Sequence, residues 1–133
     1  MKTIITYGTF DLFHEGHFNL LTRAKLLGDY LIVGVTDTQY DIRRGKKDVH
    51  DSLEIRISNV RNTNLADLIV IEKHEQQKQD DILKYNVDTF VVGDDWLGKF
   101  DYLSELCDVL YLSRTPGISS SIIRQQLMEM NMT

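Results

Sequence analysis

Two histidines, His14 and His17, lie three residues apart at the junction between a strand-like run and a helical pattern. The run from Thr3 to Tyr7 is rich in β-branched and aromatic residues, which is typical of a buried strand. The apolar residues from Leu20 to Leu27 recur at helical spacing. The pair can therefore share one face at the start of a helix. Because unpaired backbone N–H groups and the helix dipole favour anions there, the junction predicts an anion site.

Three interpretations of this pair imply different chemistry. A zinc site needs three or four ligands, yet HEGH is not the H-E-x-x-H of metalloproteases, and only His50 and His74 remain as further histidines. A structural pair would be hydrogen-bonded to the backbone. We favour a third interpretation, in which both imidazoles donate hydrogen bonds to phosphoryl oxygens and to charge that develops in a transition state.

The composition of the 133-residue chain, with 42% apolar and 26% charged residues, is that of one ordinary domain over 1–133. No apolar run is long enough for a membrane span, and the N-terminus lacks a signal-peptide pattern, so we expect a cytoplasmic protein. The single cysteine, Cys107, excludes an internal disulfide. A formal net charge of −5 argues against nucleic acid as a partner, so phosphate-binding groups have to be concentrated locally.

Strand-like and helical patterns alternate along the chain, which predicts an α/β fold. The expected architecture is a single Rossmann-like domain, a five-stranded parallel sheet with helices on both faces. Ligands of such sheets lie beyond the carboxyl ends of the strands. The expected strands are 3–7, 30–36, 68–71, 89–92 and 109–112, and the expected helices are 16–27, 52–62, 77–85, 100–106 and 119–129.

Local signals mark several ends of these elements. Gly28 is expected to cap the first helix, and Asp51 with Glu54 forms a capping-box pattern before the second. The irregular stretch 37–51 is expected to be a loop. Its cations suit either a solvated surface or a phosphate, and charge alone favours the solvated surface. These cations are Arg43, Arg44, Lys46 and Lys47.

Two polar clusters follow the fourth and fifth strands, where the architecture predicts a site. Residues 93–99, GDDWLGK, follow the fourth strand, and their Gly and Asp content makes a simple turn the usual explanation. Residues 114–121, RTPGISSS, follow the fifth strand and open the last helix. Their hydroxyls and free backbone donors, with Arg114 as a planar fork, suit either a plain helix cap or a phosphate-binding loop.

These motifs carry a resemblance to a known family. The H-x-G-H at His14 to His17 after G-T-F-D, together with the R-T-x-G-I-S motif that begins at Arg114, resembles the nucleotidyltransferase superfamily and within it the cytidylyltransferases. The segment 93–101 is similar to the G-D-D-W-x-G-K-F-D of the glycerol-3-phosphate cytidylyltransferase subfamily. The order and spacing of the three motifs extend the resemblance over nearly the whole chain.

The resemblance implies a Mg²⁺-dependent reaction of CTP with a small polyol phosphate, and glycerol 3-phosphate is the leading acceptor. It also implies a homodimer. The acceptor phosphate would attack the α-phosphorus and release pyrophosphate, which requires positioning and charge neutralisation more than covalent catalysis. The resemblance assigns catalysis to His14, His17 and Lys46, and acceptor binding to Asp11, Arg44 and Gln77. It assigns CTP binding to Gly8, Thr9, Phe10, Gly16, Asp94, Arg114, Thr115, Gly117, Ile118, Ser119, Ser120 and Ser121.

Departures from the family pattern leave alternatives open. The Arg of R-Y-V-D-E-V-I, a phosphate contact, is Asn64 here, and Arg61, close to one helical turn earlier, can take its place. Two acceptor lysines appear as Arg44 and Gln77, and the Trp of the second segment is absent, with His74 the nearest aromatic residue. The acceptor can therefore be glycerol 2-phosphate or a longer polyol phosphate. An adenylyltransferase and a non-catalytic nucleotide-binding module are the remaining alternatives.

Overall fold

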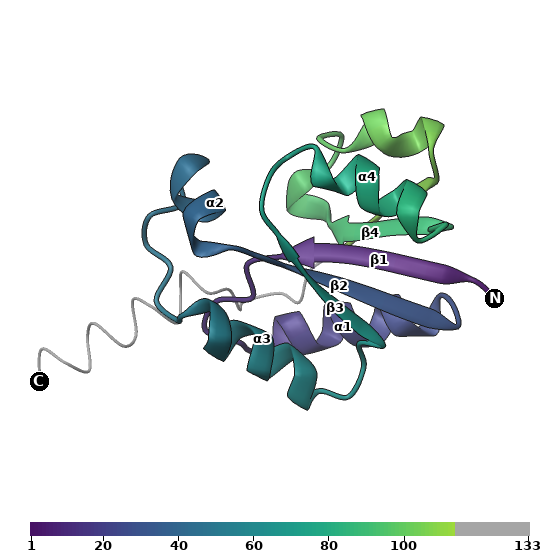
Figure 1. Cartoon of the computed structure of the whole chain (residues 1–133). Helices are drawn as coiled ribbons and strands as arrows, with labels where there is room; N and C mark the ends of the chain where they lie inside the picture. The colour runs from purple at the N-terminus through teal and green to yellow at the C-terminus, as the bar shows by residue number, and fades with distance from the viewer. Residues whose placement is uncertain (114–133) are drawn as a thin grey trace, which may run out of the picture.

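A computed structural model describes residues 1–113 and shows five parallel strands in one sheet. The strands pair in the order β3-β2-β1-β4-β5, so the chain builds outward from β1 to one edge and then to the other (Figure 1). All five expected strands are confirmed. Their bounds are β1 (Thr3–Gly8), β2 (Tyr30–Thr36), β3 (Leu68–Glu72), β4 (Thr89–Gly93) and β5 (Asp108–Leu112).

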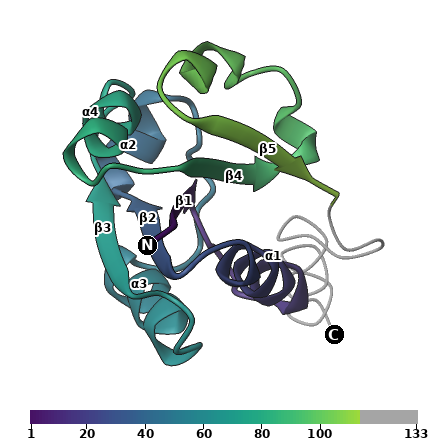
Figure 2. The ribbon, with the colours of Figure 1, turned by 90° about the vertical axis from the view of Figure 1, so that its right-hand side faces the viewer.

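Helices cover both faces of this sheet, as the alternating pattern predicts. Figures 1 and 2 show α1 (Glu15–Leu26) and α3 (Leu53–Asn62) on one face and α4 (Gln77–Lys84) on the other. A short 3₁₀ helix, η2 (Asp101–Glu105), shares the face of α4, and a second one, η1 (Asp94–Trp96), follows β4. The predicted α/β class, with a parallel sheet between two helical layers, is thus confirmed.

Each face of the sheet carries its own apolar cluster, because successive residues of a strand point to opposite sides. Ile4 of β1 belongs to the cluster of Leu21 and Ala24 on α1, whereas its neighbour Ile5 belongs to the cluster of Ile82 on α4. All five side chains are at most 2% exposed. Strands that are buried on both faces carry apolar residues on both sides, which explains the largely apolar runs in the sequence.

The stretch 37–51 contains a helix that the sequence interpretation misses. α2 (Thr38–Arg43) follows β2 directly and lies beyond its carboxyl end (Figure 1). Tyr40 and Asp41 are buried and anchor this helix. Six residues are too few for an apolar period to stand out, so the sequence pattern resembles that of a loop.

The segment 100–106 forms a 3₁₀ helix where an α-helix is expected. Its backbone bonds connect residues three apart, as from the Leu103 N–H to the Phe100 carbonyl at 3.0 Å. Both side chains are buried against α4 and the sheet, so a helix is present at the expected place but of the 3₁₀ type. The expected helix 119–129 lies outside the described residues. Within residues 1–113 no helix is long and apolar enough to cross a membrane.

Two helix ends differ from the sequence prediction. The N-cap of α3 is Ser52, whose hydroxyl accepts from the Ile55 N–H at 3.3 Å, while the Asp51 carboxylate serves another loop. Gly28 follows α1 without adopting the left-handed backbone of a glycine cap. A Cβ at this position would lie 2.7 Å from the Lys2 carbonyl oxygen, so close packing against the start of β1 explains the glycine.

Candidate active site

A cavity of about 80 Å³ opens at the carboxyl ends of β1 and β4, where the order of the strands reverses. Parallel sheets bind their ligands at this switch point. Three cationic side chains, one carboxylate and several aromatic side chains line the cavity. The lining residues are Tyr7, Gly8, Thr9, Thr36, Arg44, Lys46, Glu72, Lys78, Phe90, Val92, Trp96 and Phe100.

His14 and His17 begin α1 and cap its first turn. His14 Nδ1 accepts a hydrogen bond from the Gly16 N–H at 2.9 Å, and His17 Nδ1 accepts one from the His14 N–H at 3.2 Å. The reciprocal arrangement is a capping box in which imidazoles take the usual places of Ser and Glu. Both imidazoles are therefore hydrogen-bonded to the backbone, as in the interpretation of a structural pair. Each ring uses its Nδ1 atom for this bond.

These contacts decide which nitrogen of each ring can donate. A neutral imidazole carries one proton, so an Nδ1 that accepts leaves the proton on Nε2. Burial lowers the pKa of His17 to about 3, with His14 and Lys46 adding to the shift, and burial also lowers the pKa of His14. Both rings are therefore neutral Nε2–H donors at pH 7, stacked with centroids 3.9 Å apart. They can hydrogen-bond a phosphate without becoming charged.

The loop between β1 and α1 has unusual backbone geometry. Phe10 and Leu12 have φ angles of 54° and 48°, a left-handed region that residues other than glycine rarely adopt. Each such residue costs roughly 1–3 kcal/mol, so its surroundings have to hold it. The buried Asp11 carboxylate accepts from the backbone N–H groups of His50 and Asp51, both at 2.8 Å. Asp11, expected at the acceptor, is thus bonded to this neighbouring loop and does not line the cavity.

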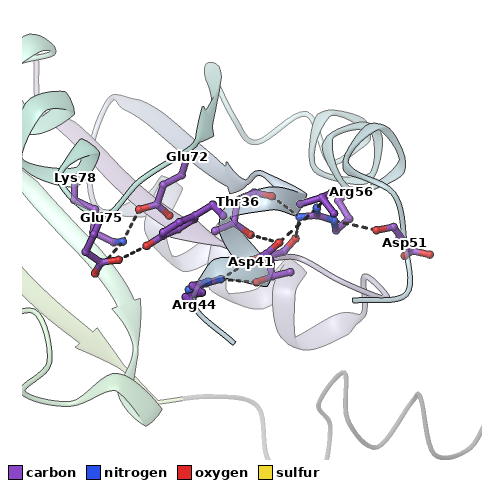
Figure 3. Close-up of polar contacts among 11 residues, drawn as sticks. Thr36, Asp41, Arg44, Asp51, Arg56, Glu72, Glu75 and Lys78 are labelled. Carbon is purple, nitrogen blue, oxygen red and sulfur yellow. Dashed lines mark hydrogen bonds and ion pairs between the residues drawn. The ribbon is translucent and has the colours of Figure 1, made fainter. Parts of the chain in front are cut away.

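Arg56, on α3, joins the ends of two strands and is not singled out by the sequence interpretation. Its fully buried Nη1 donates to the carbonyls of Thr9 and Thr36, at 3.0 and 2.7 Å (Figure 3). Asp41 Oδ2 lies 3.6 Å from Nη2 and balances the charge. A sequence signal does exist, because Arg56 occupies the apolar stripe of α3, four residues before the buried Val60.

Two cations of the 37–51 stretch reach the cavity. Arg44 Nη2 donates to Thr9 Oγ1 at 3.0 Å and to Asp41 Oδ1 at 2.8 Å, and the guanidinium lies over the Tyr40 ring. Lys46 lines the same cavity. A solvated surface therefore does not describe these two residues, because the fold places them beside the loop that leads to the histidines.

Arg61, the expected phosphate contact, and Gln77, the expected acceptor contact, lie away from the cavity lining. Arg61 is exposed in the last turn of α3, just before the turn into β3 and hence at the amino edge of the sheet, and its phosphate contact stays a prediction. The Gln77 amide donates to the Ile71 carbonyl and accepts from the Lys73 N–H, both at 2.8 Å. Gln77 does not line the cavity, and its contact with the acceptor stays a prediction.

The residues expected at CTP fall into three groups. Gly8 and Thr9 line the cavity, and Phe10 and Gly16 belong to the adjoining loop and helix start. Asp94 is exposed in η1, on the segment that also supplies an aromatic residue to the cavity wall. The remaining ones lie outside the described residues: Arg114, Thr115, Gly117, Ile118, Ser119, Ser120 and Ser121.

A buried polar group bounds the cavity on the side of α4. Lys78 Nζ lies 2.5 Å from Glu72 Oε2, and both side chains are at most 4% exposed (Figure 3). Tyr7 lies beside them and donates its hydroxyl to Asp81 at 2.7 Å. Burial raises the pKa of the Glu72 carboxyl, and Lys78 opposes this shift. The sequence interpretation places a polar contact at Gln77. In the structure the next residue, Lys78, lines the cavity.

Metal ligands do not cluster in the described part of the chain. Within residues 1–113 no three His, Cys, Asp or Glu side chains are arranged to hold an ion. Mg²⁺ commonly keeps several waters and binds through one or two carboxylates together with substrate phosphates.

The strand order, with an anion-suited helix start at the switch point, defines a Rossmann-like α/β fold. The solved structure of the lipopolysaccharide core biosynthesis protein from Thermoplasma volcanium GSS1 has this fold. Its TM-score is 0.70 and its sequence identity 21%, and the match covers 86% of this chain and 98% of that structure.

The family follows from the sequence comparisons. Residues 5–126 match the model of the cytidylyltransferase-like family, and the chain belongs to this family. It is 51% identical over 127 residues to the glycerol-3-phosphate cytidylyltransferase of Bacillus spizizenii, across 96% of this chain and 98% of that protein. The glycerol-3-phosphate cytidylyltransferase of Staphylococcus aureus is 46% identical across 96% of both chains.

Proposed function

We propose that this chain transfers the cytidylyl group of CTP to glycerol 3-phosphate, giving CDP-glycerol and pyrophosphate. The observation that carries the proposal is its identity of 46% to 51% with glycerol-3-phosphate cytidylyltransferases across 96% of its length. The cavity supports it as well, because Arg44, Lys46 and a helix start with two imidazole donors lie at one end of the sheet.

The reaction assigns a task to each of these groups. An oxygen of the acceptor phosphate attacks the α-phosphorus of CTP, and the bond from that phosphorus to the pyrophosphate oxygen breaks. His14 and His17 donate their Nε2–H groups to phosphoryl oxygens on which negative charge grows. Lys46 neutralises the triphosphate, and Arg44 holds the acceptor phosphate beside Thr9. The protein positions the reactants and stabilises charge, and no covalent intermediate is required.

The phosphates of CTP would carry Mg²⁺ into this site, where the ion supplies further neutralisation of charge. The proposal of Mg²⁺ rests on the resemblance to the family. Chelation of Mg²⁺ with EDTA is expected to abolish pyrophosphate release and to weaken CTP binding in calorimetry. Full activity in EDTA would contradict the metal requirement and leave the transfer reaction intact.

We also propose a cytoplasmic homodimer, which rests on the resemblance to the family. Light scattering after size exclusion measures the molar mass directly. A mass near twice the 15.4 kDa of the chain is expected, and a monomer at micromolar concentration would contradict the dimer.

The experiment that tests the activity is pyrophosphate release with each of the four nucleoside triphosphates. The acceptors are glycerol 3-phosphate, glycerol 2-phosphate and ribitol 5-phosphate, because the acceptor-side departures leave the polyol open. CTP with glycerol 3-phosphate is expected to give the highest kcat/KM. Equal turnover with ATP would reject the cytidylyl assignment. Absence of pyrophosphate with every pair would favour a non-catalytic nucleotide-binding module.

A further inference from the structure

The Glu72 and Lys78 side chains form an ion pair at the inner end of the cavity that the mechanism above does not use. Their charged atoms are 2.5 Å apart. The Lys78 ammonium also lies 5.3 Å from the ring centroids of Tyr7 and Phe100, so aromatic faces flank it. All four residues line the same cavity. The pair is therefore enclosed by protein on most sides and borders the space where a ligand would lie.

A buried ion pair usually contributes little net stability to a fold. Removing two charges from water costs several kcal/mol per ion, and apolar replacements of similar volume are often neutral or stabilising. Ile82 and Phe100 supply apolar packing around α4. The position of Glu72 and Lys78 on the cavity wall points to ligand recognition.

We propose that Glu72 and Lys78 together hydrogen-bond the hydroxyl groups of the acceptor and thereby select a polyol phosphate over a plain alkyl phosphate. This inference rests on the proposed function. A hydroxyl group both donates and accepts, and the pair offers both partners: the Glu72 carboxylate accepts, and the Lys78 ammonium has donors beyond the one used on Glu72. Glu75 Oε1 lies 4.0 Å from the same ammonium, so the group carries no excess positive charge and suits a hydroxyl better than a second phosphate.

The positions of the other two cations, Arg44 and Lys46, are consistent with a cavity that binds the acceptor phosphate at one end and the acceptor hydroxyl groups at the other. Arg44 is bonded to Thr9, on the loop that leads to the histidines, and Lys46 is close enough to His17 to affect its pKa. The phosphate of the acceptor is attracted to that end, next to the reacting α-phosphorus. The carbon chain then extends toward Lys78, where the rings of Tyr7 and Phe100 pack against its C–H groups.

The test compares two acceptors, glycerol 3-phosphate and propyl phosphate, which lacks the hydroxyl groups. The variants are Glu72→Gln, Lys78→Met and the double variant, which removes both charges of the buried pair. In each, we expect KM for glycerol 3-phosphate to rise about 10- to 100-fold, the loss typical of a hydrogen bond to a charged group. KM for CTP and kcat/KM for propyl phosphate are expected to stay close to wild type. Lys84→Met, at an exposed lysine of the same helix, is the matched control.

Thermal unfolding and CTP binding by calorimetry show which variants are folded. If a single variant does not fold, the double variant carries the test. An unchanged ratio of kcat/KM between the two acceptors in a folded variant overturns the hydroxyl-binding role and leaves the transfer reaction standing. Absence of turnover by the wild-type chain with every polyol phosphate rejects the proposed function itself, and this inference with it.

Discussion

Asp11 and Asp51 fasten two loops to each other by reciprocal hydrogen bonds. The Asp11 carboxylate accepts from the Asp51 N–H at 2.8 Å, and the Asp51 carboxylate accepts from the Leu12 N–H at 3.1 Å. One loop leads from β1 to the capping histidines, and the other precedes α3. Since Phe10 and Leu12 are held at positive φ, these bonds stabilise the conformation of the loop that leads to the helix start.

Replacing Asp51 with Ala should therefore impair catalysis more than its loss of stability explains. We expect a destabilisation of about 1–2 kcal/mol and a fall in kcat/KM of roughly tenfold, because the loop can leave its strained conformation. The control is Asp88→Ala, which removes a similar bond to the Thr3 N–H at the opposite edge of the sheet. Equal activity losses in the two variants would show that the Asp51 effect is one of global stability.

The histidine at the N-cap can be tested for its two roles separately. His14→Asn keeps a side-chain acceptor for the Gly16 N–H but removes the Nε2–H donor, while His14→Ala removes both. Turnover should fall by roughly 10² or more in both variants, as for a lost preorganised donor. Only the Ala variant should lose about 1 kcal/mol of stability, measured by chemical unfolding. Wild-type turnover in the Asn variant would establish that His14 acts as a cap alone.

The lowered pKa of His17 predicts a loss of stability on acidification. Its folded pKa of about 3 lies below its ordinary value of 6.5, so the unfolded chain binds the proton more tightly between these pH values. Stability should accordingly fall as pH drops from 6.5 toward 3, by at most about 1.4 kcal/mol per pH unit from this group. His17→Asn, which cannot titrate there, should lose less stability than wild type between pH 7 and pH 4. Parallel unfolding curves for the two proteins would contradict the shift.

Gln77→Lys tests whether the family position at residue 77 faces the acceptor in this chain. Because the Gln77 amide bonds to backbone groups at the end of β3, we expect an unchanged order of acceptors and a destabilisation of about 1–2 kcal/mol. Gln76→Lys, at a neighbouring exposed residue without a capping bond, is the matched control. A lowered KM for glycerol 3-phosphate in Gln77→Lys alone would place residue 77 at the acceptor.

The sequence by itself was sufficient to predict the sheet. Strands buried on both faces carry largely apolar runs, and such runs are local properties that a single sequence displays. The helix start with His14 and His17 is likewise visible, because the capping bonds join residues that are neighbours in the chain. The motif and the start of the helix coincide there, so the helix start could be predicted before the fold was known.

Contacts between distant segments could not be predicted in the same way. Arg56 reaches Thr9 and Thr36 across 47 and 20 residues of chain, and no local pattern identifies those carbonyls as its partners. α2 was missed for a related reason, since its short sequence is held by buried Tyr40 and Asp41 rather than by its own periodicity. Bonds of this kind depend on how the strands are ordered, which is a property of the whole fold.

The sequence also could not decide between adjacent residues of one helix. Gln77 and Lys78 both lie in the first turn of α4, and successive helical residues point about 100° apart. Ile82, four residues after Lys78, packs into the core beneath the sheet and fixes the rotation of the helix. That rotation directs Lys78 to Glu72 and the cavity, and it leaves Gln77 at the end of β3. The sequence determined which elements form, whereas tertiary packing decided which side chains they present to the site.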